Sequence, residues 1–117
     1  MAAKDALGRR GEAIAARHLV RSGVVIVERN WRCLAGEIDL VARDGDELVF
    51  VEVKTRSSVD YGHPLEAITP RKLARLRRLA GEWCLAHPDE RGAIRIDAVA
   101  VIAPAIEAVM LTAFHSP

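Results

Sequence analysis

This chain has few aromatic residues, few cysteines and no long apolar run, and each shortage excludes a class of protein. Aromatic residues make up 4% of the 117 residues, whereas half of the chain is hydrophobic. The core must therefore be aliphatic, and a nucleic-acid platform built from exposed stacking rings is disfavoured. The two cysteines, Cys33 and Cys84, lack metal-ligand spacing, and we expect them to be reduced. Without an apolar run of about 18 residues, the sequence predicts no membrane span.

The length and the first residues bound the organisation of the chain. A chain of 117 residues predicts one domain over residues 1–117, large enough to fold without disulfides or metals. The first residues lack an apolar signal segment, since Lys4, Asp5, Arg9 and Arg10 are charged. We therefore expect a cytoplasmic protein.

The charges are unevenly distributed along the chain. The formal net charge is only +1, so the whole molecule is not an electrostatic attractor for nucleic acid. Acids concentrate in residues 36–52, whereas residues 71–78 contain no acid and hold Arg71, Lys72, Arg75, Arg77 and Arg78. This layout suits a protein that holds phosphates in one region and a metal in another. Arginines on a solvated helix face would give the same pattern.

Hydrophobic periodicity predicts a mixed α/β domain. Apolar residues at helical spacing predict helices from about Asp5 to Ser22 and from Thr69–Pro70 to about His87, with Thr69 as an N-cap. Alternating or β-branched runs predict strands at Val24–Arg32, Gly36–Val41, Phe50–Arg56, Ala93–Ile102 and about Ile106–Phe114. The resulting order, α-β-β-β-α-β-β, predicts a mixed central sheet flanked by helices.

The most informative pattern is a predicted hairpin formed by Gly36–Val41 and Phe50–Arg56 around the turn signal Asp44-Gly45. A two-residue loop would pair Asp39 with Phe50, a four-residue loop would pair it with Glu52, and both registers keep the same faces. The predicted apolar face holds Ile38, Leu40, Ala42, Val49, Val51 and Val53. The predicted charged face holds Glu37, Asp39, Glu52 and Lys54.

Acids and a lysine at one end of a hairpin indicate metal-assisted phosphodiester hydrolysis. Asp39 and Glu52 supply the oxygen ligands that Mg²⁺ prefers, and the backbone carbonyl of Val53 adds a third. Lys54 orients the attacking water and stabilises developing negative charge. Salt bridges of Glu52 and of Lys54 with neighbouring strand residues would explain the same residues without catalysis.

Two further acids extend this hypothesis. Glu12, at the edge of the apolar stripe of the first helix, reaches the site if that helix packs across the end of the sheet. Glu37 is a further candidate on the same strand face as Asp39. In both cases a solvated or ion-paired glutamate is the structural alternative.

The order Asp39…Glu52-Val53-Lys54 resembles the Asp…Glu-X-Lys signature of the PD-(D/E)XK nuclease superfamily, with Ile38 before the aspartate instead of proline. Over nearly its whole length the chain is similar to uncharacterised protein family 0102, a group of endonuclease-like bacterial proteins. The segments that carry this similarity are Gly8-Arg9-Arg10-Gly11-Glu12, Asn30-Trp31-Arg32, Gly36-Glu37-Ile38-Asp39-Leu40, Phe50-Val51-Glu52-Val53-Lys54-Thr55-Arg56, Lys72 and Arg95-Ile96-Asp97.

The resemblance implies a restriction-endonuclease-like fold, also described as tRNA-endonuclease-like, with a layout similar to archaeal Holliday-junction resolvases. It implies that Asp39 and Glu52 bind Mg²⁺ or Mn²⁺, that Lys54 orients water, and that Glu12 is an accessory ligand. It further implies that Arg32 and Arg56 contact phosphates and that Lys72 supports the site.

The expected function is a metal-dependent nuclease that acts on structured or branched DNA in repair or recombination. By analogy with the resolvases, we also expect a homodimer, because cutting a junction needs two sites in a fixed relation. A non-catalytic nucleic-acid-binding module on the same fold is the alternative, and Arg71 and Arg75 would serve either function. A purely structural domain with an ion-paired hairpin is the third hypothesis.

Overall fold

The computed structural model describes residues 6–57, 64–102 and 110–116. In chain order its elements are α1 (Ala6–Arg21), β1 (Val25–Cys33), β2 (Gly36–Asp44), β3 (Glu47–Arg56), a 3-10 turn η1 (Pro64–Ala67), α2 (Pro70–Ala86), β4 (Ala93–Ile102) and β5 (Met110–Ser116). The predicted mixed α/β layout and its element order are confirmed. The 3-10 turn was not predicted.

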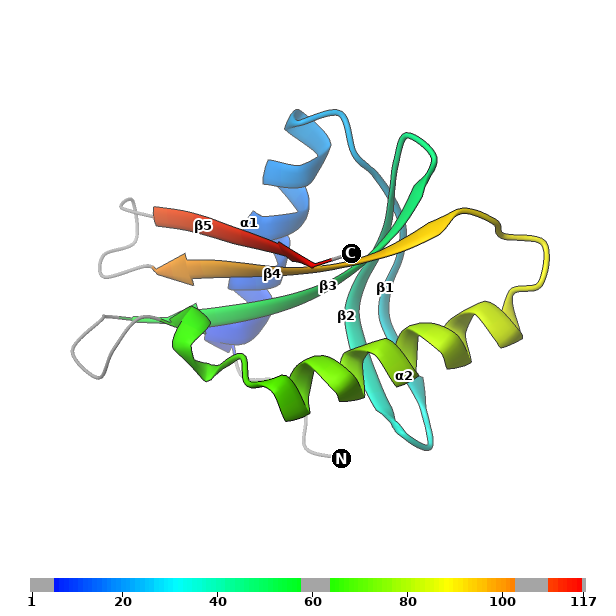
Figure 1. Cartoon of the computed structure of the whole chain (residues 1–117). Coiled ribbons are helices and arrows are strands. Elements are labelled where there is room, and N and C mark those ends of the chain that lie inside the picture. Colours follow the sequence, from blue (N-terminus) through cyan, green and yellow to red (C-terminus); the bar gives the residue numbers. More distant parts are fainter. Residues whose placement is uncertain (1–5, 58–63, 103–109, 117) are drawn as a thin grey trace.

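A five-stranded mixed sheet forms the centre of the molecule (Figure 1). The strands lie in chain order, and all neighbours are antiparallel except β3 and β4, which are parallel. The parallel pair requires a crossover connection, and η1 and α2 provide it. Strand β3 therefore pairs with β4 along its whole length, and with β2 over Glu47–Val51.

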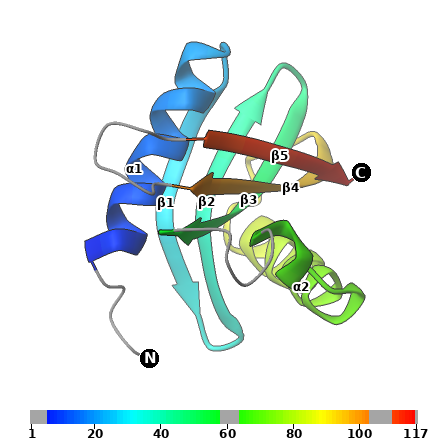
Figure 2. The same ribbon diagram turned by 90° about the vertical axis from the view of Figure 1, so that its left-hand side faces the viewer.

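The two helices cover opposite faces of this sheet (Figure 2). On one face α1 buries Ala15, Ala16 and Leu19 against aliphatic residues of β2, β3 and β4. On the other face α2 buries Leu76, Leu79, Ala80 and Trp83 against Ile38, Val41, Leu48, Phe50 and Ile96. Both helices are amphipathic, so each face of the sheet receives one apolar stripe.

The hairpin turn selects one of the two predicted registers. Arg43 lies opposite Leu48 and Leu40 opposite Val51, which is the register that brings Asp39 to the level of Glu52. The loop itself contains only Gly45 and Asp46, because Asp44 and Glu47 still pair. Gly45 has a φ of 59°, a conformation that the tight turn requires and glycine adopts without strain.

The predicted alternation of faces is wrong at one residue of β2. Leu40 packs on the α1 face, as its neighbours of the same parity should, but Ile38 packs on the α2 face. The neighbouring strand β1 also breaks its alternation there. Arg29 pairs with Leu40 and Trp31 pairs with Ile38. Asn30, between them, has a φ of 53°. The two strands therefore turn together at Asn30 and Asp39, and strict alternation fails there.

Helix α1 approaches the sheet most closely at Gly11. A Cβ atom on Gly11 would collide with the side chain of Thr55 on β3. The absence of a side chain therefore lets the helix backbone lie against the end of β3, and the next residue, Glu12, is 9% exposed. Glycine is the residue that permits this close approach.

The predicted element boundaries hold to within a few residues. Thr69 caps α2, since its side-chain oxygen accepts a 3.2 Å hydrogen bond from the backbone N–H of Lys72. Strand β4 has the predicted bounds, whereas β5 begins at Met110 and extends two residues past the predicted end at Phe114. The predicted start of that strand, Ile106, lies outside the described residues.

An ion-pair network fastens the end of the sheet beside the Gly45 turn. The guanidinium of Arg95 on β4 lies 3.0 Å from Asp97, 3.0 Å from Glu47 and 3.1 Å from Asp44. Asp97 is 1% exposed, and its ion pair with Arg95 compensates the cost of burying its charge. This network gives Arg95 and Asp97 a structural role.

No helix within the described segments is both long enough and apolar enough to cross a membrane.

Candidate metal and phosphodiester site

Asp39 lies where β2 and β3 cease to pair. The paired positions end at Leu40 and Val51, and beyond them the carboxylate of Asp39 takes the place of a strand neighbour. Its Oδ2 accepts a 2.8 Å hydrogen bond from the backbone N–H of Val53. Asp39 is only 7% exposed, so its carboxylate is held rigidly at the opening between the strands.

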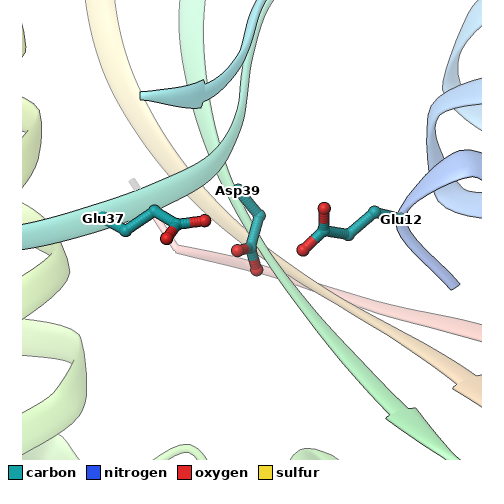
Figure 3. Close-up of side chains that lie close together, drawn as sticks. All are labelled: Glu12, Glu37 and Asp39. Atoms are coloured by element: carbon teal, nitrogen blue, oxygen red, sulfur yellow. The ribbon is translucent and has the colours of Figure 1, made fainter. Parts of the chain in front are cut away.

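Three carboxylates converge at this opening (Figure 3). Glu12 comes from α1 and Glu37 and Asp39 from β2, and one oxygen from each lies within 4.8 Å of the others. Figure 3 shows Asp39 between the two glutamates, with all three side chains directed toward a shared space. Carboxylates at such separations repel one another unless a cation lies between them, so their arrangement could hold a metal ion.

Glu52 and Lys54 occupy the adjoining end of β3. Lys54 Nζ lies 3.2 Å from Glu52 Oε1, so the two residues form an ion pair with each other along β3. Burial raises the pKa of Glu52 above its usual value of 4.5, and the charge of Asp39 raises it further. Lys54 and Arg75 act in the opposite direction, and the pKa remains raised. Glu52 therefore lies close enough to Asp39 for the two carboxylates to repel each other electrostatically.

These side chains line one pocket of about 340 Å³. Its lining is Leu7, Gly8, Glu12, Asp39, Glu52, Val53, Lys54, Thr55 and Arg56. Helix α1 forms one wall and the end of β3 another, so the Gly11–Thr55 contact determines the spacing of the walls. All four residues of the predicted catalytic set, together with Val53, meet in this pocket.

Only some of the basic residues predicted to contact nucleic acid lie at the pocket. Arg56 lines the pocket, and Arg75 is close enough to lower the pKa of Glu52. Arg32 instead donates from Nε to Glu37 Oε2 at 3.2 Å. Arg71 and Lys72 lie in the first turn of α2 and are not among the residues that line the pocket.

The donor set fits a hard divalent cation. Glu12, Glu37 and Asp39 offer carboxylate oxygens that lie within 4.8 Å of one another, and Glu52 and Val53, which the sequence also predicted as ligands, line the adjoining pocket. Mg²⁺ and Mn²⁺ prefer oxygen ligands of this kind. Glu37 was considered only as a further candidate in the sequence, and its convergence with Glu12 depends on how α1 docks, which periodicity does not reveal.

Sequence reasoning did not find a second, smaller hollow beside the first. It has a volume of about 170 Å³ and is lined by Arg9, Glu12, Ala13, Arg29, Asn30 and Leu40. Arg9 and Arg29 come from a helix and a strand that are separated in sequence, so no local pattern brings them together. The motif Asn30-Trp31-Arg32 was the only nearby signal, and it pointed to Arg32.

Comparison with known proteins gives a consistent result. The family model for Uncharacterised protein family UPF0102 matches residues 11–101. A UPF0102 protein of Clavibacter michiganensis is 60% identical over 104 residues, which cover 89% of this chain and 88% of that protein. A UPF0102 protein of Beutenbergia cavernae is 61% identical over 102 residues, which cover 87% and 86%. The UPF0102 protein FRAAL5785 of Frankia alni is 54% identical over 106 residues, or 91% and 88%.

The fold and the pocket together define an α/β protein with a buried carboxylate cluster at the end of its central sheet. The chain belongs to the uncharacterised protein family UPF0102.

Proposed function

We propose that this protein is a metal-dependent nuclease that hydrolyses phosphodiester bonds in DNA. Structured or branched DNA, as formed in repair and recombination, is the proposed substrate class. The observation that carries the proposal is the convergence of Glu12, Asp39, Glu52 and Lys54 in one pocket at the end of β3. Membership of UPF0102 is compatible with this function and names no activity.

The carboxylates are the proposed metal ligands. Asp39 is buried and oriented by the N–H of Val53, so little side-chain entropy is lost when it binds a cation. Glu52, the carbonyl of Val53 and Glu12 complete the proposed set, and Glu37 lies within reach of the same space. A bound Mg²⁺ or Mn²⁺ would supply Lewis-acid activation of the phosphate and of an attacking water.

Lys54 is the residue proposed to position the water. Its ammonium group already lies 3.2 Å from Glu52, at the pocket wall, where it can donate to a water and stabilise charge on the phosphate oxygens. A cation bound to Glu52 would compete with Lys54 for the same carboxylate, and this would leave the ammonium group of Lys54 available to the substrate.

Basic side chains around the pocket are proposed to bind the DNA backbone. Arg56 lines the pocket, and Arg75 on α2 is close enough to Glu52 to interact with its carboxylate electrostatically. Arg71 and Lys72 extend this surface along the first turn of α2, and Arg32 neighbours Glu37. Phosphate contacts of this type position a strand without reading its sequence, which suits recognition of DNA shape.

A cleavage assay tests the proposal. Labelled four-way junctions, flaps, duplex and single strands would be incubated with Mg²⁺ or Mn²⁺ and with wild type, Asp39→Asn or Glu52→Gln. We expect a metal-dependent cut that either variant lowers by at least about 100-fold, because each removes a ligand charge at the reacting centre. Cleavage of no substrate by the wild type, or equal cleavage by Asp39→Asn, would contradict the proposal.

Matched controls separate chemistry from contamination and misfolding. Asp46→Asn makes the same substitution at an exposed turn residue, and Glu82→Gln does so on the exposed side of α2. Both should cut like the wild type. Isothermal titration of Mn²⁺ into the same five proteins reports whether loss of cleavage follows loss of metal.

A non-catalytic nucleic-acid-binding module is the second candidate. The exposed residues Arg71, Arg75, Arg77 and Arg78 on α2 favour it, since they present basic charge to solvent outside the pocket. This function predicts DNA binding that weakens steeply with salt and is unchanged in Glu52→Gln. Binding that survives Glu52→Gln without any metal-dependent cleavage would select this function over the nuclease.

A homodimer accompanies the nuclease proposal, because two cuts in a junction need two pockets in a fixed relation. Light scattering of the free protein and of its complex with a junction tests this. A monomer in both states would exclude paired cutting within one complex.

A further inference from the structure

The hollow of about 170 Å³ beside the catalytic pocket has the features of a binding site for a second phosphate. It contains two arginines, Arg9 from α1 and Arg29 from β1, and an apolar floor at Leu40. Arg9 and Ala13 are four residues apart on α1 and therefore lie on the same face of the helix. Helix and strand thus supply one arginine each to the lining of a single hollow.

The backbone of β1 is built so that Arg29 faces this hollow. Asn30 has a left-handed φ of 53°, and among the non-glycine residues that the structure describes it alone has a positive φ. Because the strand turns there, Trp31 packs on the α2 face while Arg29, opposite Leu40, points to the α1 side. An asparagine tolerates this conformation better than most residues, so the turn costs little.

Glu12 connects the hollow to the pocket. It is buried and lines both, so the two hollows adjoin at this residue. A strand whose reacting phosphodiester lies beside Asp39 and Glu52 must place its neighbouring phosphates within a few ångströms of the pocket rim. The hollow adjoins the pocket and offers two arginines beside Glu12, with room for a phosphate group.

We infer that Arg9, Arg29 and Asn30 form a binding site for a backbone phosphate adjacent to the one that is cut. The inference rests on the proposed nuclease function, and it names how the substrate strand is held. Arginine suits this role because its guanidinium donates two parallel hydrogen bonds to phosphate oxygens. The amide of Asn30 adds a neutral donor at the edge of the hollow.

Binding to a fluorescein-labelled four-way DNA junction tests the inference, with EDTA present so that neither metal nor cleavage contributes. Fluorescence anisotropy over a salt series would compare wild type with Arg29→Ala and Arg9→Ala. We expect each variant to bind on the order of tenfold more weakly and the slope of log K against log salt to become shallower by about 0.9. Arg91→Ala, an exposed arginine in the loop between α2 and β4, removes the same charge at a distant place.

A variant that fills the hollow without changing charge sharpens the test. Ala13 is exposed and lines the hollow, so Ala13→Leu should occupy it while preserving helix α1 and both arginines. We expect Ala13→Leu to weaken binding as Arg29→Ala does, whereas Ala86→Leu, at an exposed position of α2, should bind like the wild type. Thermal unfolding of each variant confirms that the fold is retained.

The outcomes separate this inference from the proposed function. If the wild type binds and cuts DNA but Arg29→Ala behaves like Arg91→Ala, or Ala13→Leu binds like the wild type, the phosphate site is wrong and the nuclease stands. If the wild type neither binds nor cuts any DNA, the proposed function fails and the phosphate site fails with it.

Discussion

The backbone N–H of Val53 donates a 2.8 Å hydrogen bond to the side chain of Asp39, across the gap where β2 and β3 part. An aspartate therefore completes the hydrogen bonding of a central strand. The same carboxylate faces Glu12 and Glu37. Asp39 therefore contributes both to the stability of the sheet and to the negative charge of the pocket. Different substitutions of Asp39 can separate these two contributions.

Asp39→Ala and Asp39→Asn should differ in stability and agree in loss of metal binding. Alanine leaves the buried N–H of Val53 without its acceptor, which should lower the free energy of unfolding by about 1–3 kcal/mol. Asparagine keeps an acceptor oxygen and should recover most of that loss, yet it lacks the ligand charge. Urea unfolding and Mn²⁺ calorimetry check both effects; equal stability of the two variants would show that the hydrogen bond contributes nothing.

The raised pKa of Glu52 predicts a pH dependence of stability. Burial, then Asp39, raises this pKa above 4.5 in the folded state, so the folded protein holds the proton over a pH range where the unfolded chain has released it. The contribution of Glu52 to stability is therefore fully present below about pH 4.5 and is lost as pH rises through the folded pKa.

Glu52→Gln carries no such titration, so its stability relative to the wild type should improve as pH rises through that window. Urea unfolding at a series of pH values measures the difference, with Glu82→Gln as the exposed control. Addition of Mn²⁺ should reverse the trend for the wild type, because a cation stabilises the ionised carboxylate. A difference between Glu52→Gln and wild type that stays constant with pH would contradict the assignment of burial as the main cause.

Gly11→Ala and Gly81→Ala should shift stability in opposite directions although both replace a glycine within a helix. The new methyl group at Gly11 meets Thr55, so α1 must move away from β3 at a cost of about 1–3 kcal/mol. Gly81 has open space around it, and alanine there should stabilise α2 by about 0.5–1 kcal/mol. Thermal unfolding compares the two directly. Because the Gly11 variant also displaces Glu12, its metal affinity should fall, while that of the Gly81 variant should not.

Glu28 should prove to be a structural partner of the buried indole on α2. Trp83 is fully buried, and its Nε1 donates a 2.9 Å hydrogen bond to Glu28 Oε1. His87 stacks on the same ring with centroids 4.0 Å apart. Glu28→Leu removes the acceptor and should cost about 1–3 kcal/mol, whereas Glu28→Gln retains it and should cost less. Unfolding followed by tryptophan fluorescence distinguishes them, and equal losses would mean that the hydrogen bond is not the cause.

Local patterns predicted the elements of this fold well because each helix and strand carries its own period. The N-cap at Thr69 and the bounds of Ala93–Ile102 needed no tertiary information. The face of Ile38 could not be predicted, because the turn at Asn30 depends on backbone torsions that residue polarity does not encode. The hairpin register was likewise open until the turn was seen to contain only Gly45 and Asp46.

The candidate site was predictable where its residues share a hairpin and less so where they do not. Asp39, Glu52 and Lys54 follow from spacing on two adjacent strands. The proximity of Glu12 to Glu37 required the docking of α1, which the position of Glu12 at the edge of an apolar stripe suggested but did not fix. Arg9 and Arg29 meet through tertiary packing alone. Arg32 and Glu37 are instead direct cross-strand neighbours in the β1–β2 hairpin, and this local pairing was not predicted.

The amide of Val53 has a consequence for spectroscopy. Most amides of a central strand report on their neighbouring strand, but this one reports on a carboxylate. Its chemical shift should change when Asp39 binds a cation, and its hydrogen exchange should become slower if the bound cation orders that side chain. One assigned resonance would thus follow the state of the pocket in solution, without substrate and without substitution.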